Sequence, residues 1–322
     1  MKPSAKKGCF IMITYYMSTE NTLYKSDTLE QGCWIYAVAP TDAEIGEIAE
    51  KTGIESDVLK AALDEEERAR IELDEGVTLV VFDTPIASKD ENNVVTYSTI
   101  PVGVISTKNY FITVCLAENT VLADFANGFI KNVNTTLRTR MILQILMQTS
   151  TRYLQYLKQI DKITDFIEKR LYKATTNNEL VQLLDLQKSL VYISTSLKNI
   201  EMTLSKIERG RILKLYTEDE ELLEDVIIEF RQAREMADTF ASVLSGTIET
   251  FSSVISNNLN VTMKKLTSVT ILLAIPTMIS GFYGMNIGME GIPLAGNFWL
   301  PLGISVLITT IAAIILIKKK ML

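Results

Sequence analysis

Two long apolar stretches lie at the C-terminal end of the chain. Leu266–Met285 and Phe298–Ile317 each contain about 20 residues, the length that a helix needs to cross the hydrocarbon core of a bilayer. Between Lys265 and Lys318 the only formally charged side chain is Glu290. The pattern therefore predicts two transmembrane spans joined by a short loop.

A regular three-and-four spacing of apolar residues precedes the first span. It follows Thr217–Glu220, which has the sequence of a capping box and predicts a helix start. The spacing is typical of a helix packed against other helices, and nothing interrupts it before the span. At ~1.5 Å per residue, one helix from Thr217 to Asn286 would be on the order of 100 Å long. The positions of this seam are Leu223, Val226, Phe230, Ala233, Ala237, Phe240, Leu244, Thr247, Phe251 and Val254.

The seam can be followed into the first span, where it becomes small and polar. Two interpretations stay open there: a face that lines water, or a small-residue contact between helices. Asn260, Thr270 and Thr277 favour water, because polar groups in hydrocarbon need partners. The stripe consists of Asn260, Met263, Thr267, Thr270, Ala274, Thr277, Gly281 and Gly284.

The part before the seam divides into two regions. Residues 9–130 mix short β-rich runs with helices at Thr41–Lys51, which opens with a capping box, and at Ser56–Ala62. Proline is absent between Pro101 and Pro276, which favours long helices at roughly Thr136–Lys173 and Glu179–Arg209. The expected strands are Cys9–Met17, Gly32–Val38, Val77–Phe82, Ile100–Ile105 and Tyr110–Val114.

These patterns predict the fold class: an α+β cytoplasmic domain followed by long helices and two C-terminal transmembrane helices. The short apolar run at Cys9–Met17 has no cleavage-like site after it, so a strand is expected there rather than a signal peptide. The expected division is 1–133 for the α/β domain, 134–216 for a helical hairpin, 217–265 for the stalk of the pore helix, 266–286 for the first span, 287–297 for an external loop, 298–317 for the second span and 318–322 for a basic tail.

The composition of this 322-residue chain limits the partners, metal ligands and reactions that it can support. The net charge of −7, without a long basic run, makes nucleic acid an unexpected partner. Histidine is absent, which removes imidazole as a metal ligand and as a general base. With no Gly-rich phosphate loop either, no catalytic residues are expected and the chain is predicted not to be an enzyme. Oxygen ligands remain, and these suit hard cations such as Mg²⁺.

The three cysteines, Cys9, Cys33 and Cys115, form no paired motif and are expected to be buried thiols.

Positive charges at the ends of the spans predict the topology. Lys264 and Lys265 precede the first span and Lys318, Lys319 and Lys320 follow the second, whereas the loop Ile287–Asn297 has no lysine or arginine. The positive-inside rule then places both termini in the cytoplasm and the loop outside, in a multi-pass protein of the plasma or inner membrane.

The first span ends with Tyr283-Gly284-Met285-Asn286, and the motif is followed by one more span and a lysine tail. This arrangement, together with Asn260–Thr267 and Pro276-Thr277 earlier in the helix, resembles the CorA family of magnesium channels. The resemblance implies a funnel-shaped homopentamer that passes and is regulated by Mg²⁺. It implies a selectivity filter at Gly284, Met285 and Asn286 and a basic collar at Lys264, Lys265 and the tail lysines. With the stripe above, the expected pore-lining residues are Asn260, Met263, Leu266, Thr267, Thr270, Ala274 and Thr277.

The same resemblance implies regulatory Mg²⁺ sites between neighbouring cytoplasmic domains. Asp225 and Glu249 lie on the long helix where family members have acidic residues, and Asp90 lies near the partner position in the α/β domain. Many relatives carry an acidic loop of the Met-Pro-Glu-Leu kind after the filter. Here Glu290 stands in a different loop sequence, so the outer ring could differ in charge.

Three functions are compatible with the sequence. The first is a homo-oligomeric channel for Mg²⁺, with Co²⁺ and Ni²⁺ as further ions. The second is a zinc transporter of the same superfamily; such relatives usually alter the middle residue of the motif, whereas this chain keeps Met285 and lacks histidine. The third is a membrane-tethered coiled-coil scaffold without a pore, for which Asn286 would be dispensable.

Overall fold

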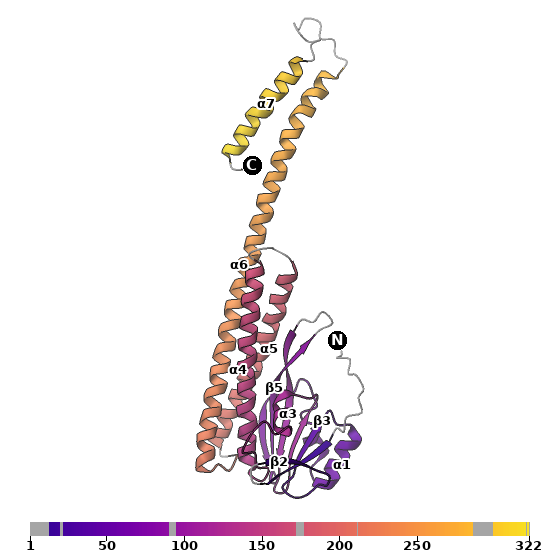
Figure 1. The fold of residues 1–322 in the computed structure, drawn as a ribbon, viewed down its shortest axis with the longest axis vertical. Coiled ribbons are helices and arrows are strands. Elements are labelled where there is room, and N and C mark those ends of the chain that lie inside the picture. The colour runs from indigo at the N-terminus through magenta and orange to yellow at the C-terminus, as the bar shows by residue number, and fades with distance from the viewer. Residues whose placement is uncertain are drawn as a thin grey trace. The chain divides into compact units, whose positions relative to one another are not determined.

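The computed structural model describes residues 13–19, 22–89, 95–171, 177–210, 212–285, 299–319 and 321 (Figure 1). The chain forms two compact units, Met1–Gly246 and Thr247–Leu322. The boundary between them falls within the predicted stalk, and the finer seven-part division stays a prediction. The helices are α1 (Asp42–Thr52), α2 (Ser56–Lys60), α3 (Thr120–Ala126), α4 (Arg138–Leu171), α5 (Asn177–Gly210), α6 (Thr217–Tyr283) and α7 (Trp299–Lys318).

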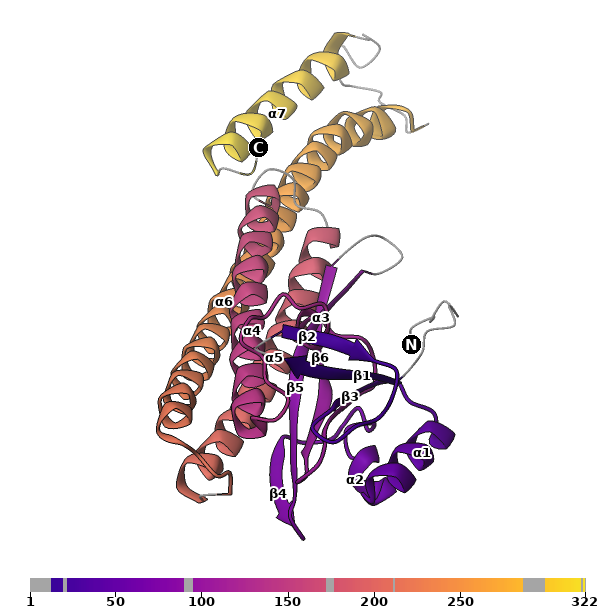
Figure 2. The ribbon, with the colours of Figure 1, turned by 60° about the horizontal axis from the view of Figure 1, so that its bottom comes forward.

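A seven-stranded sheet organises the first unit, in the order β2-β1-β3-β7-β6-β5-β4 (Figure 2). Neighbouring strands are antiparallel except β3 and β7, which pair in parallel. All five residues of β7 are buried, as in a strand covered on both faces. The strands are β1 (Ile13–Thr19), β2 (Thr22–Ser26), β3 (Trp34–Val38), β4 (Arg70–Asp74), β5 (Val77–Lys89), β6 (Val95–Ser106) and β7 (Phe111–Cys115).

Strand β3 contributes side chains to the packing on both faces of the sheet, because successive side chains point to opposite sides. Ile35 and Ala37 belong to the cluster that includes Ile45 of α1. Trp34 points the other way, where its Nε1 donates to Thr113 Oγ1 at 2.8 Å. On that side α4 and α5 pack against β5 and β6. The two free cysteines of the described residues, Cys33 and Cys115, are buried, as predicted.

Most predicted elements are confirmed, and the structure adds three short ones. The capping box at Thr41 and Glu44 is present in full, and α1 ends at Gly53 in the left-handed conformation with φ 72°. Strands β2 and β4 and helix α3 were not predicted. Both strands are at the edges of the sheet, are five residues long and are largely exposed. Strand β2 has no regular apolar alternation, whereas Ile71 and Leu73 of β4 alternate with charged residues, so a strand signal for β4 was present in the sequence.

The start of α6 differs from the predicted capping box. Thr217 is the first helical residue rather than the N-cap, and Tyr216 occupies the cap position. The Asp219 carboxylate accepts a hydrogen bond from the Tyr216 backbone N–H at 3.3 Å, while the Asp219 N–H donates to the Tyr216 carbonyl at 2.8 Å. Asp219 therefore performs the capping role that the predicted box assigns to Glu220, and the hydroxyl of Thr217 is one position too late to accept.

The three-and-four seam of α6 is buried within the first unit. Phe230 contacts the ring of Tyr153 on α4, with 6.3 Å between centroids. Beside the sheet, α4, α5 and the first part of α6 run next to one another (Figure 1). The seam therefore holds a helix–helix contact in this unit, as the spacing predicts. Its least exposed residues are Leu223, Val226, Phe230, Ala233, Ala237 and Leu244.

A buried polar cluster joins the sheet to the helices. The Tyr153 hydroxyl of α4 lies 3.2 Å from the backbone carbonyl oxygen of Asp83 on β5 and 2.7 Å from Ser196 Oγ on α5. Burial raises the pKa of the Asp83 carboxyl, and a hydrogen bond from Ser196 offsets part of that effect. Burial and the nearby Asp83 raise the pKa of Tyr153 well above its ordinary range. Burial in this cluster therefore disfavours the ionised form of the Asp83 carboxyl relative to its neutral form.

We predict that Asp83→Asn stabilises the protein at pH 7. The folded-state pKa of Asp83 lies above its unfolded value of 3.8, so the folded state binds more protons in that window and stability falls as the pH rises through it. The asparagine amide is uncharged, so it avoids the cost of burying an ionised carboxylate. Its carbonyl oxygen can still accept the hydrogen bond from Ser196. The melting temperature of the detergent-solubilised protein should rise by about 3 °C, and the gain should shrink as the pH is lowered toward 4.

Asp74→Asn is the matched control, because Asp74 is exposed on the edge strand β4. It should change neither the melting temperature nor its pH dependence. An Asp83→Asn protein that melts lower than the parent at pH 7 would show that the charged carboxylate is stabilising.

Candidate functional site

Two helices of the described chain are long and apolar enough to cross a membrane: α6 and α7. In the most apolar stretch of each helix only 11% of the residues are buried by the rest of the chain. Leu273 of α6 and Leu307 of α7, for example, are 67% and 62% exposed. Because exposed leucine and isoleucine are unfavourable in water, these faces require lipid or other protein chains around them.

A polar contact ties the two helices together near the cytoplasmic lysines predicted above. Ser268 is fully buried, and its Oγ lies 2.9 Å from the Lys264 carbonyl oxygen and 3.0 Å from that of Met321, just beyond α7. Figure 1 shows α7 running beside the last part of α6. The contact brings Lys264 and Lys265 to the same end of the helix pair as Lys318 and Lys319, and all four side chains are exposed.

The seven predicted pore-lining residues are all exposed on α6, where no residue of α7 covers them. Thr270, Ala274 and Thr277 line one shallow depression of about 460 Å³ with Leu273 and Met278. The structure thus brings three of the predicted residues onto one surface. The complete set is Asn260, Met263, Leu266, Thr267, Thr270, Ala274 and Thr277.

The threonine hydroxyls of this face are oriented by the helix itself. Thr270 Oγ1 donates to the Leu266 carbonyl at 2.9 Å, and Thr277 Oγ1 donates to the Leu273 carbonyl at 3.0 Å. With its one hydrogen used in this way, each hydroxyl oxygen keeps its lone pairs for a donor outside the helix. The water molecules around a cation direct hydrogens outward, so they are suitable donors to such a face.

Helix α6 ends just before the predicted filter. The Gly284 N–H donates to the Ser280 carbonyl at 3.0 Å, and a Cβ on Gly284 would come to 3.3 Å from that oxygen. Glycine therefore relieves crowding where the chain leaves the helix. Met285 is 51% exposed and is the last described residue of this segment. The predicted sites at Asn286, Glu290, Asp90 and Lys320 lie outside the described residues.

The predicted regulatory carboxylates do not form a metal site within one chain. Asp225 belongs to the first unit and Glu249 to the second, and both are exposed on α6. Among the described residues, no group of three or more histidine, cysteine, aspartate or glutamate side chains is arranged to hold a metal ion. Any metal at Asp225 or Glu249 would therefore need water or another chain for most of its ligands.

Sequence reasoning missed Ser268, although a signal for it was present. Small hydroxyl residues inside a membrane helix are typical of positions where another helix approaches closely. Ser268 immediately follows Thr267 of the stripe, one helical position around, so it faces α7 while the stripe faces away.

The fold and the two apolar helices define a class: a membrane protein with an N-terminal α/β unit and a C-terminal pair of spanning helices. The chain belongs to the family of CorA-like Mg²⁺ transporter proteins, whose family model matches residues 30–319. This confirms the resemblance that the sequence suggested. Members of this family are transporters, so the protein is not an enzyme.

Relatives and solved structures support the same assignment. The cobalt/magnesium transport protein CorA of Methanocaldococcus jannaschii is 27% identical over 290 residues, which are 86% of this chain and 87% of that protein. The Thermotoga maritima protein of the same name is 25% identical over 170 residues, 52% of this chain and 48% of that one. The complete structure of the M. jannaschii CorA magnesium transporter matches with a TM-score of 0.78 and 25% identity, covering 95% and 97% of the two chains. The predicted fold class is thereby confirmed.

Proposed function

We propose that this protein is a homopentameric channel that conducts Mg²⁺ across the cell membrane and also admits Co²⁺. One observation carries the proposal: the exposed face of α6 presents hydroxyl oxygens as acceptors along the first span and leads to Gly284-Met285-Asn286. Membership of a family of Mg²⁺ transporters and the similarity to two cobalt/magnesium transport proteins support the choice of ion.

A pore requires several copies of the chain. The described part of one chain supplies two candidate spans, and two helices cannot enclose a water-filled path. The stripe on α6 is also left uncovered by α7, so its threonines would face lipid in a monomer. A ring of chains places these stripes around a common axis, where water satisfies the hydroxyl oxygens. The resemblance to the CorA family supports five copies.

The chemistry of the stripe fits a hydrated divalent cation. Mg²⁺ loses its water reluctantly and usually retains several water ligands. Threonine and asparagine oxygens can accept hydrogen bonds from those waters without replacing them. No carboxylate lies between Lys265 and Asn286, which favours passage, because conduction requires binding weak enough for release.

The distribution of lysines supports cytoplasmic termini. Four exposed lysines gather at the Ser268–Met321 end of the helix pair, namely Lys264, Lys265, Lys318 and Lys319. The loop between the spans has neither lysine nor arginine. By the positive-inside rule the lysine end is cytoplasmic and the Asn286 end is external.

We predict that Asn286→Ala lowers Mg²⁺ flux into proteoliposomes by at least about tenfold. Each chain of the ring loses one amide acceptor, and each lost hydrogen bond is worth ~1 kcal/mol, so several losses together exceed the ~1.4 kcal/mol of a tenfold change. Flux of Mg²⁺, Co²⁺ and Zn²⁺ should be measured side by side to separate a magnesium channel from a zinc transporter.

The control for this substitution is Thr310→Ala on α7, because Thr310 is exposed and bonds only to the Val306 carbonyl of its own helix, at 2.7 Å. Its flux should match that of the parent. Undiminished and equally selective flux through the Asn286→Ala protein would reject the filter and favour a scaffold without a pore.

Assembly is tested directly by native mass spectrometry of the detergent-solubilised protein. We expect a species of five chains, about 180 kDa from the 36.1 kDa monomer. The Asn286→Ala protein should give the same species, because the filter contributes little to the contacts that hold the ring. A monomer or dimer as the sole species is incompatible with a pore around the α6 stripe.

We also propose that cytoplasmic Mg²⁺ closes the channel through Asp225 and Glu249. Both carboxylates are exposed and like-charged, so copies brought together in a ring repel one another. A divalent ion bound between chains offsets that repulsion and favours the arrangement in which the carboxylates are close. A ligand shifts an equilibrium only by its differential affinity for the two states, and here the difference is the assembled set of carboxylates.

The combination Asp225→Asn with Glu249→Gln should therefore raise the internal Mg²⁺ concentration that half-inhibits flux by about tenfold, a loss of ~1.4 kcal/mol in binding. The parent value is expected on the order of 10⁻⁴–10⁻³ M, the range of weak oxygen-ligand sites. Glu224→Gln with Glu235→Gln, two other exposed residues of α6, is the control. If the two double variants respond identically to internal Mg²⁺, the sensor lies elsewhere.

A further inference from the structure

A polar pocket in the first unit lies apart from the spans and their stripe. It has a volume of about 540 Å³ and is bounded by the end of β6, the first turn of α4 and the segment that leads into α6. Its size is within the range of ~300–1,000 Å³ that accommodates small organic ligands. The side chains that matter for its chemistry are Ser106, Arg138, Arg140, Lys214, Tyr216 and Asp219.

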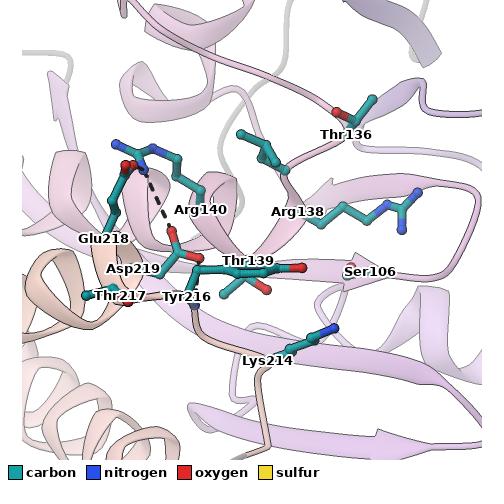
Figure 3. A pocket seen from close by; sticks show the side chains of 11 residues that line it. Ser106, Thr136, Arg138, Thr139, Arg140, Lys214, Tyr216, Thr217, Glu218 and Asp219 are labelled. Carbon is teal, nitrogen blue, oxygen red and sulfur yellow. Dashed lines mark hydrogen bonds and ion pairs between the residues drawn. The ribbon is translucent and has the colours of Figure 1, made fainter.

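The acidic side chains of the pocket and its unpaired cations lie on different sides of it. Arg140 is neutralised, because its Nη1 lies 2.8 Å from Glu218 Oε2 and 3.9 Å from Asp219 Oδ1. Within the described part of the chain, neither Arg138 nor Lys214 forms an ion pair with a carboxylate. Figure 3 shows Arg138 and Lys214 extending toward Ser106, while Arg140 turns to the acidic side of the pocket. One side of the pocket is therefore positively charged without compensation.

Arg138 lies in an environment that is unfavourable for a cation. It begins α4, whose first turn contains no acidic residue, although the start of a helix favours negative charge. Its Nε atom is buried and makes no hydrogen bond to the described residues. Burial also lowers the pKa of the Arg138 guanidinium. A buried donor without a partner costs free energy, and an anion beside the guanidinium would offset the cost of burying its charge.

Tyr216 supplies a planar surface beside the two cations. Its backbone caps α6, through the Asp219 N–H and Glu220 N–H that donate to its carbonyl at 2.8 and 3.0 Å. The side chain takes no part in that cap and is 60% exposed at the pocket. Lys214 Nζ lies over the ring, 5.6 Å from its centroid, so the ammonium covers one face and a stacked ligand would use the other. A ligand that combines an anionic group with a flat ring matches this pair.

We propose that this pocket binds a nucleoside phosphate, with the phosphate held by Arg138 and Lys214 and the base stacked on Tyr216. Guanidinium and ammonium groups are the strongest donors to phosphate that proteins have. Bases stack on aromatic side chains whatever their identity. The paired carboxylates at Glu218 and Asp219 repel the phosphate from their end and so orient the ligand. The site is formed by residues of the first unit alone, so it does not depend on the pore proposed above.

Isothermal titration of the full-length protein in detergent, in magnesium-free buffer with a chelator, tests the site. The probes are inorganic phosphate, ADP and ATP. We expect ADP and ATP to bind more tightly than phosphate. Arg138→Gln and Lys214→Gln should each weaken ADP binding by about tenfold, and Tyr216→Leu should remove about a tenfold advantage of ADP over phosphate.

The matched control is Lys206→Gln, because Lys206 is an exposed lysine of α5 outside the pocket. Its affinity for ADP should equal that of the parent. Three results would each overturn the proposal: no binding of any probe at millimolar concentration, equal affinity for phosphate and ADP, or unchanged ADP binding by Arg138→Gln.

A second measurement needs no substitution and so does not depend on the folding of a variant. The parent protein is treated with an amine-acetylating reagent, with and without ADP, and the modified lysines are identified by mass spectrometry. ADP should protect Lys214 and leave Lys206 unprotected. Equal acetylation of Lys214 in both samples would also reject the site, whatever the ion flux through the channel.

Discussion

The structure depends on one constraint: polar groups that enter hydrocarbon must find a partner. Three hydroxyl residues in the first span meet it in two ways. Ser268 is buried and reaches a carbonyl oxygen beyond α7, whereas Thr270 and Thr277 donate to carbonyls one turn back in their own helix. The first arrangement closes the α6–α7 pair. The second satisfies the donors and leaves hydroxyl oxygens as acceptors on the opposite face, which suits contact with water or with another helix.

The same three-and-four spacing along α6 therefore marks two different kinds of helix surface. In the first unit the three-and-four positions are large and apolar, and Phe230 and Leu244 are almost completely buried. Within the first span, from Thr267 to Gly284, the positions become threonine, alanine and glycine and are exposed. Periodicity indicates which residues share a face, but side-chain chemistry decides what that face meets. A buried seam contacts other helices of the same chain. An exposed and partly polar seam is available for contact with water or with other chains.

Sequence reasoning predicted features that depend on local chemistry. The capping box of α1, the buried strands near the centre of the sheet and the apolar length of both spans all follow from residues close together in the chain. The Gly284-Met285-Asn286 motif and the lysines are also local patterns, but the role of the motif as a filter stays a prediction and Asn286 lies outside the described residues. The short edge strand β2 was missed because its five residues have no regular apolar alternation, whereas β4 was missed although Ile71 and Leu73 alternate with charged residues.

Features that join distant segments could not be predicted in this way. Tyr153, Ser196 and Asp83 come from three elements and meet only in the folded unit. Arg138 and Lys214 are likewise 76 positions apart, the difference of their numbers, and share a pocket only because α4 and α6 both begin at its edge. Nothing in either local sequence separates these cations from the ordinary charged residues of helix surfaces.

In the proposed function, the placement of the carboxylates would link regulation to assembly. Mg²⁺ requires six oxygen ligands in near-octahedral geometry, and it retains water where protein oxygens are few. Asp225 and Glu249 are single exposed side chains, and no cluster of three such ligands occurs in the described part of one chain. A monomer would therefore hold Mg²⁺ only weakly at either residue, while a second chain can add its own carboxylates to the same hydrated ion. The α6 stripe and these residues are both incomplete in one copy, so in the proposed channel the pore and the sensor would both depend on contact between chains.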